Sequence, residues 1–212
     1  MWFSVAEWLA MTYGKLSLTD LLVKQPGPGE RGTSGIMGPM TTCRLITPAD
    51  APVLAQLLRL NRDFLAPWEP LRGDDYFTED RQRIAIQDAL REQQEGRNLP
   101  LVIVDGAGGV VGRITLNNIV RGAFQSCSVG YWVSQAAGGR GVATAAVKQI
   151  ISVAFGELGL HRLQAETLLH NVASQKVLER NGFVRIGMAP TYLKIAGRWQ
   201  DFILYQLIND AA

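Results

Sequence analysis

The chain has 212 residues, 47% of them hydrophobic, which favours one globular domain with a short additional segment. Its 21 basic and 19 acidic residues leave a net charge of +2, so no broad field attracts nucleic acid or an anionic membrane. No apolar stretch reaches the roughly 18 residues of a membrane span, and the N-terminus lacks the positive start of a signal peptide. We therefore expect a cytoplasmic protein that acts on a small ligand or a protein surface and contacts no membrane.

Residues 1–40 differ in composition from the rest of the chain. Residues 25–39 are rich in glycine and proline and lack a periodic apolar pattern, which is typical of a linker. Met37 and Met40 lie just before regular patterning begins, so either is a candidate for the biological start. We expect residues 1–40 to be a partly flexible extension, a tag or an overlong start, and residues 41–210 to form the folded domain.

The domain begins with alternating strand and helix patterns. Thr42–Ile46 reads as a strand, and Thr47–Asp50 then combines an N-cap, a proline at the first helical position and an acid at the third. Apolar residues follow at helical spacing: Val53, Leu54, Leu57 and Leu58. A second helix is predicted from Thr78, its N-cap, to a stop near Gly96.

The middle of the domain is rich in strand patterns. Leu101–Val104 and Val110–Asn117 flank the glycine-rich turn Asp105–Gly109, which predicts a β-hairpin. Ser126–Val133 is the next predicted strand. The helix expected after it has these residues on one apolar face: Val147, Ile150, Ile151, Ala154 and Phe155.

The last third supplies one more helix between strands. Leu163–Leu168 is a predicted strand, and Asn171–Arg180 is a predicted helix that Asn181-Gly182 closes. Val184–Ile186 and Phe202–Ile208 are the final predicted strands. Together the elements predict an α/β or α+β domain with a mixed sheet in its middle.

A glycine-rich turn joins the strand that ends at Val133 to the next helix. Such a turn directs backbone N–H groups and a helix N-terminus at one spot, which favours a bound phosphate. Gly139 and Gly141 leave room for close approach of a ligand. A nucleotide P-loop needs a Lys-Ser or Lys-Thr pair that is missing here, and a dinucleotide fingerprint needs a third glycine where this chain has Thr144.

The turn and its flanking stretches together resemble the GNAT acetyltransferase superfamily. The flanking stretches are Tyr131–Val133, Asn171–Ser174 and Leu178–Phe183. The cofactor-binding turn of that superfamily begins with Gln or Arg, has Gly at its fourth position and ends with Gly or Ala. Gly138–Ala143 matches this pattern except at Gly138, so one side-chain contact of the family pattern is absent there.

A closer resemblance is to the ribosomal-protein alanine N-acetyltransferases of the RimJ type. It rests on Pro67–Pro70, Asn118–Phe124, the glycine turn and Tyr192–Asp201. The resemblance implies the GNAT fold, in which helices flank a central, mixed, mostly antiparallel twisted sheet. It also implies an N-acetyltransferase that takes the acetyl group from acetyl-CoA, releases coenzyme A and uses no metal.

The implied acceptor is the α-amine of a protein N-terminus, and by extension the alanine or serine terminus of a small-subunit ribosomal protein. Two alternatives stay open. One is an enzyme that acetylates a small amine such as an antibiotic, a polyamine or an amino acid, and the other is a non-catalytic sensor that binds acyl-CoA. We expect a monomer or homodimer that does not bind nucleic acid directly.

In GNAT enzymes the thioester lies between two parting strands, which here are those that end at Val133 and Leu168. A backbone N–H near Val133 is expected to face the developing oxyanion. The expected cofactor-binding residues are Trp132, Val133, Gly138, Gly139, Arg140, Gly141, Val142, Ala143, Thr144, Asn171 and Ser174.

Glu69 is the favoured general base, acting directly or through water. It lies between two prolines beside Trp68, and an apolar loop of this kind tends to raise the pKa of a carboxyl. The alternatives are that Glu69 is an ordinary loop acid or binds the acceptor ammonium, that Glu166 on a strand beside the cleft is the base, or that water alone suffices.

Ser174 and Tyr192 are the candidates for the acid that protonates the leaving thiolate. The resemblance places Ser174 against the coenzyme A sulfur, although a serine in a first helical turn is as often a helix-start residue. Asn171 is expected to cap the same helix and to contact the pantetheine arm. Tyr192 serves either as the acid or as a wall of the acceptor pocket, and Thr191 excludes the base that some relatives carry just before this aromatic residue.

The acceptor site is expected to include five side chains: Trp68, Glu69, Asn118, Arg121 and Trp199. Arg198 is expected to shape the same mouth. His161 and His170 have no acidic or cysteine cluster suited to a metal, so no metal site is predicted.

Overall fold

The computed structural model describes residues 41–210, so the predicted extension at residues 1–40 lies outside the described part of the chain. The first half contains β1 (Thr42–Leu45), α3 (Ala51–Leu60), α4 (Arg62–Leu65), α5 (Glu79–Gln94), β2 (Leu99–Val104) and β3 (Val110–Val120). Short 3-10 turns occupy Pro48–Asp50, Ala66–Trp68 and Asp74–Phe77. Within residues 41–210 no helix is long and apolar enough to cross a membrane.

The second half contains β4 (Ser126–Val133), α6 (Val142–Ser152), β5 (Arg162–Leu168), α7 (Val172–Arg180), β6 (Val184–Ile195) and β7 (Arg198–Ile208). A 3-10 turn at Gln135–Ala137 precedes α6, and a π-helical turn at Val153–Glu157 follows it. The predicted helix starts are confirmed. Thr47 forms a capping box with Asp50, and the Thr78 hydroxyl accepts a hydrogen bond from the Arg81 N–H at 3.3 Å.

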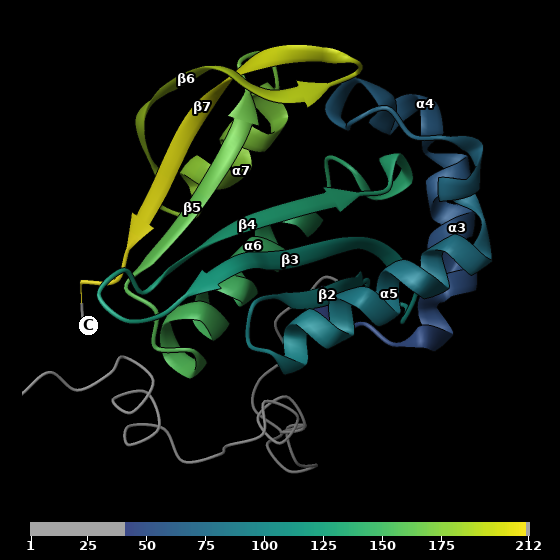
Figure 1. Ribbon diagram of the computed structural model, residues 1–212, viewed down its shortest axis with the longest axis horizontal. Helices are drawn as coiled ribbons and strands as arrows, with labels where there is room; N and C mark the ends of the chain where they lie inside the picture. Colours follow the sequence, from purple (N-terminus) through teal and green to yellow (C-terminus); the bar gives the residue numbers. More distant parts are fainter. Residues whose placement is uncertain (1–40, 211–212) are drawn as a thin grey trace, which may run out of the picture. The chain divides into compact units, whose positions relative to one another are not determined.

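Within residues 41–210, seven strands form one sheet in the order β1-β2-β3-β4-β5-β7-β6. Every neighbouring pair is antiparallel except β4 and β5, which run parallel. The prediction of a mixed, mostly antiparallel sheet is therefore confirmed. Helices α3 and α5 pack on one face of the sheet, while α6 and α7 pack on the other, as Figure 1 shows.

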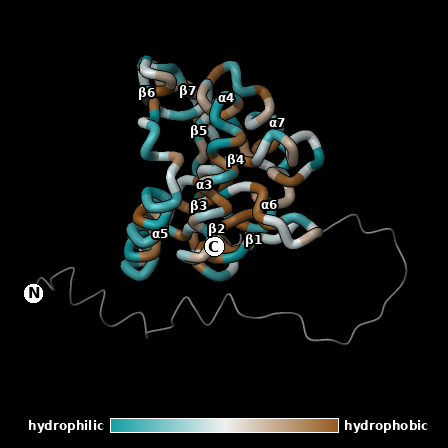
Figure 2. The backbone as a smooth tube through the Cα atoms, turned by 90° about the vertical axis from the view of Figure 1, so that its right-hand side faces the viewer, coloured by the Kyte–Doolittle hydropathy of each residue, from teal (hydrophilic) through white to brown (hydrophobic). Residues whose placement is uncertain are grey.

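The apolar faces of the helices explain this layering. Ala51 and Leu54 of α3 and Ile86 of α5 are buried against Val102 of β2, and Trp132 of β4 packs against the same cluster. Figure 2 shows α5 mostly in the hydrophilic colour, whereas the central strands and α6 carry much of the hydrophobic colour. Burial of the inner face, rather than helix propensity alone, holds α5 on the sheet.

The strands β6 and β7 are longer than their sequence pattern indicates. The predicted Val184–Ile186 extends to Ile195, because β6 is an edge strand whose mostly exposed side chains lack a regular apolar alternation. Its pairing with β7 also shifts register twice, which hides the period of two. Ala196 and Gly197 close the hairpin with φ of 47° and 80°, the left-handed pair of a two-residue turn.

The parallel pair β4 and β5 is joined over only a short length. Ser126, Cys127 and Ser128 pair with Arg162, Leu163 and Gln164, and beyond these residues the two strands are no longer paired. Figure 1 shows β4 and β5 diverging from that point in a wedge. In the wedge, the N–H and C=O groups that β4 and β5 would otherwise use to pair with each other are available to a ligand.

Candidate functional site

A cavity of about 400 Å³ lies where β4 parts from β5, and we call it the splay cavity. The end of β4, the glycine turn with the first turn of α6, one side of α7 along its length, and the segment around α4 line it. All the predicted cofactor residues except Arg140 line it: Trp132, Val133, Gly138, Gly139, Gly141, Val142, Ala143, Thr144, Asn171 and Ser174. Residues as far apart in the sequence as Trp132 and Ser174 therefore line the same cavity.

The glycine turn has the backbone that a phosphate cradle requires. Gly139 and Gly141 have φ of 70° and 81°, and a Cβ built on either would meet no atom within 4 Å. The space beside both glycines is therefore open, and α6 begins at Val142 with its N-terminal N–H groups next to the turn. Lys176 and Arg180 of α7 add positive charge to the wall. Sequence reasoning missed these two, because periodicity does not show which side of α7 meets the turn.

Asn61 holds the segment that leads into this turn. It is buried between α3 and α4, and its Oδ1 accepts hydrogen bonds from the Gln135 N–H at 2.7 Å and the Ser134 hydroxyl at 3.3 Å. Its own amide donates to the Leu57 carbonyl at 2.7 Å. Asn61 thereby ties the first helices to the start of the glycine turn across more than 70 residues of sequence, which no local pattern reveals.

Ser174 is paired with a tyrosine that sequence reasoning did not single out. The Tyr131 hydroxyl lies 2.9 Å from Ser174 Oγ and 3.3 Å from the Ser174 carbonyl oxygen. Burial raises the pKa of Tyr131 to about 12, so this phenol stays protonated at neutral pH. Asn171 caps α7, since its side chain accepts a hydrogen bond from the Ser174 N–H at 3.1 Å, as predicted.

A second cavity, of about 510 Å³, adjoins the splay cavity, and we call it the α5 cavity. Trp68, Tyr131 and Trp132 line both cavities. Glu69 lines the α5 cavity, so the predicted base and the predicted acid stand on two cavities with a common wall.

Contacts with the β6–β7 hairpin hold the loop that carries Glu69. The Glu69 carbonyl accepts a hydrogen bond from the Ala196 N–H at 2.9 Å. Trp68 packs against the cluster of Leu168, Ile195 and Phe202, and its ring centroid lies 5.3 Å from that of His170. The Glu69 side chain is 21% exposed, and its carboxylate lies 3.8 Å from the Arg72 guanidinium. Burial raises the pKa of Glu69, and the Arg72 charge partly opposes that rise.

A third cavity, of about 610 Å³, lies beside β6 and is called the β6 cavity. It contains Asn118, Glu166 and Tyr192, and none of the residues that line it also lines the splay cavity. Burial raises the pKa of Glu166, and burial together with the charge of Glu166 raises the pKa of Tyr192. The rival base and the second acid candidate therefore lie apart from the splay cavity.

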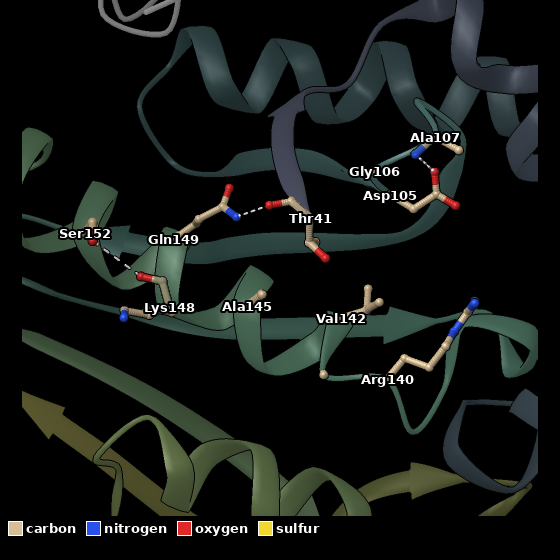
Figure 3. A pocket seen from close by; sticks show the side chains of 11 residues that line it. Thr41, Asp105, Gly106, Ala107, Arg140, Val142, Ala145, Lys148, Gln149 and Ser152 are labelled. Atoms are coloured by element: carbon tan, nitrogen blue, oxygen red, sulfur yellow. Dashed lines mark hydrogen bonds between the residues drawn. The ribbon is translucent and has the colours of Figure 1, made fainter. Parts of the chain in front are cut away.

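Three other predicted residues lie elsewhere. The Arg121 guanidinium donates to the Leu158 carbonyl, and Trp199 is 63% exposed near the tip of the β6–β7 hairpin. Arg140 donates to the Ala136 carbonyl at 2.8 Å and lines a cavity of about 850 Å³ beside α6, which shares Gly141 and Val142 with the splay cavity. Figure 3 shows that cavity, where the Gln149 amide reaches the Thr41 carbonyl and none of the predicted catalytic side chains is present.

Known proteins match the domain over most of its length. A family model described as "Acetyltransferase (GNAT) domain" matches residues 41–184. The probable N-acetyltransferase YjcK of Bacillus subtilis is 34% identical over 150 residues, which cover 70% of this chain and 83% of that protein. The ribosomal protein uS5-alanine N-acetyltransferase of Escherichia coli is 32% identical over 166 residues, or 77% of this chain and 85% of that protein.

Among solved structures, Mycobacterium smegmatis RimJ in complex with CoA-disulfide superposes with a TM-score of 0.78. It is 30% identical, and the match covers 80% of this chain and 82% of that one.

Proposed function

This chain belongs to the GNAT acetyltransferase family, and on that premise we propose that it transfers the acetyl group of acetyl-CoA to the α-amine of a protein N-terminus. The observation that carries the proposal is the common wall of the splay and α5 cavities, which supports a two-substrate site. The similarity to the uS5-alanine N-acetyltransferase supports an alanine terminus of a ribosomal protein as the acceptor, and we extend the proposal to the similarly small serine.

The splay cavity fits the phosphates and arm of acetyl-CoA, which supplies an activated acetyl group when it is bound. The N–H groups around Gly139, Gly141 and the start of α6 are suited to phosphate oxygens, with Lys176 and Arg180 as counter-charges. The Ser134 N–H donates to the Val111 carbonyl of β3. Because successive strand residues point their N–H groups to opposite sides, the Val133 N–H faces the wedge, where it can polarise a carbonyl.

Glu69 is the base that this arrangement favours over Glu166. The α5 cavity of Glu69 shares walls with the splay cavity, whereas the β6 cavity of Glu166 shares residues with the α5 cavity and none with the splay cavity. A carboxylate with a raised pKa is a better proton acceptor near neutral pH than an ordinary one. Glu69 therefore takes the proton that the acceptor amine must lose.

We expect Ser174→Ala to lower kcat about tenfold, with a smaller change in the KM for acetyl-CoA. In this proposal the Ser174 hydroxyl gives a proton to the leaving thiolate and regains one from Tyr131, whose hydroxyl lies 2.9 Å away and takes up a proton from water in turn. Positioned acid catalysis contributes about 10² or more, of which water restores a part. Steady-state kinetics measure the effect, and Tyr192→Phe is the control, with kcat expected within about twofold. A larger loss in Tyr192→Phe than in Ser174→Ala would move the acid to Tyr192.

The acceptor is tested with intact ribosomal proteins. We expect a purified small-subunit protein set from a strain lacking this enzyme to gain one acetyl group on at least one N-terminus when enzyme and acetyl-CoA are added. Intact-mass spectrometry measures the gain, and Glu69→Gln enzyme is the matched control. An unchanged set of masses, alongside rapid acetylation of a free amino acid or polyamine, would replace the protein acceptor with a small amine.

A further inference from the structure

Arg113 presents a guanidinium without a partner to the α5 cavity. It lies on β3, and its Nε is buried with no hydrogen-bond partner among residues 41–210. None of the ion pairs in the described part of the chain includes Arg113. Burial lowers the pKa of Arg113, and the nearby Tyr76 phenol partly opposes that shift.

The other two arginines of this cavity have carboxylates beside them. Arg72 lies 3.8 Å from the Glu69 carboxylate, and Arg81 lies 4.0 Å from that of Asp75. A half-buried guanidinium without an ion pair, whose Nε also lacks a hydrogen-bond partner, is costly because it has lost water on one side without a full replacement. Such a group is expected to obtain its anion from a ligand.

The strand surface beside Arg113 is polar and has open space. Thr115 and Asn117 follow at alternate positions of β3 and line the same cavity. The residue opposite Thr115 on β4 is Gly130, and a Cβ there would come within 3.4 Å of the Asn117 amide. Gly130 lines the same cavity and adds no side chain to this surface, and Trp132 lies directly opposite Arg113 as one wall.

We propose that Arg113 binds a carboxylate of the acceptor, so that the enzyme selects acceptors with an acidic group a few residues from the reacting amine. A guanidinium can donate two parallel N–H groups to one carboxylate, which gives both strength and orientation. The inference rests on the proposed function, because it assigns the α5 cavity to the acceptor. The carboxylate comes either from an acidic side chain of a peptide or from the C-terminus of a short acceptor, and the test separates the two.

The experiment measures kcat/KM for paired peptides that begin with alanine or serine and differ only in Glu or Gln at one of the second to fifth positions. We expect wild-type enzyme to prefer the Glu peptide by about tenfold at one position, because hydrogen bonds to a charged group contribute about that much. Arg113→Gln should remove the preference while leaving the Gln peptide within about threefold, and Arg113→Lys should restore part of it. Arg83→Gln, an exposed arginine on α5 paired with Glu79, is the matched control.

Several outcomes would overturn the proposal. Equal rates for every Glu and Gln pair with wild-type enzyme refute it without any variant, and equal loss of both peptides in a folded Arg113→Gln enzyme indicates a structural role. If no peptide is acetylated, the protein-acceptor function fails by itself. The Arg113 subsite is then tested by comparing kcat/KM for alanine with that for alanine amide, and for dipeptides with that for their amides. If the enzyme does not prefer the acceptor with the free carboxylate, the proposal is refuted.

Discussion

Glu69→Gln is expected to lower kcat by about 10²–10³ while leaving the dissociation constant of acetyl-CoA within about threefold. The amide keeps the size of the side chain and cannot accept the proton of the acceptor amine. The loop should keep its place, because the Glu69 backbone carbonyl, rather than its side chain, accepts from Ala196. Steady-state kinetics with calorimetric titration of acetyl-CoA separate the two quantities.

The pH profile gives the same prediction a second signature. Burial raises the pKa of Glu69, and the base must be ionised, so wild-type kcat/KM should rise with pH through that raised value. The Gln variant should lose this rise of kcat/KM with pH.

The same raised pKa lowers the stability of the folded protein as pH rises. A carboxyl whose folded pKa is raised contributes stability that is present below the unfolded pKa and is lost as pH rises through the folded pKa. At neutral pH Glu69→Gln should therefore unfold at the same temperature or a higher one.

Glu166→Gln is the matched control for this prediction. Burial also raises the pKa of Glu166, yet its cavity has no wall in common with the splay cavity. We expect its kcat within about threefold of wild type. If Glu166→Gln loses more activity than Glu69→Gln, the base is Glu166, and if neither loses activity, water alone carries the proton.

Much of the fold could be predicted from the sequence, because most elements carry local signals. Ser126–Val133 was predicted to the residue, since a strand pattern ends there at a glycine-rich turn. Thr78 marks the start of α5 through its side-chain cap. The long β6–β7 hairpin has no such signal, because exposed edge strands do not need the alternation that burial imposes.

Only part of the candidate site could be predicted from the sequence. Gly139 and Gly141 carry a backbone signal that is local, whereas the contacts of Asn61 and Tyr131 join residues 74 and 43 positions apart. Arg121 was expected at the acceptor mouth, yet the pairing of β3 with β4 shifts register between Asn117 and Val120, and the Arg121 guanidinium donates to the Leu158 carbonyl instead. Partners that only the sheet topology brings together leave no pattern in the chain.

Gly141→Val is expected to weaken acetyl-CoA binding about 30- to 100-fold. Gly141 has φ of 81°, and a β-branched residue in the left-handed region costs about 1–3 kcal/mol. A Cβ there meets no neighbour within 4 Å, so the effect arises from the backbone rather than from a clash. The turn should relieve the strain by rearranging, which moves the N–H groups that face the phosphates away from their positions. Calorimetric titration with acetyl-CoA measures the change.

Gly187→Val separates the backbone effect from the mere addition of a side chain. Gly187 lies on β6, a Cβ there also meets no atom within 4 Å, and its φ lies outside the left-handed region. Valine favours strands, so this variant should bind acetyl-CoA within about twofold of wild type. Suppose instead that Gly141→Val binds normally but melts at a lower temperature. The turn would then have kept its shape and its N–H groups their positions, so the strain of the substitution would lower stability rather than acetyl-CoA binding, contrary to the prediction.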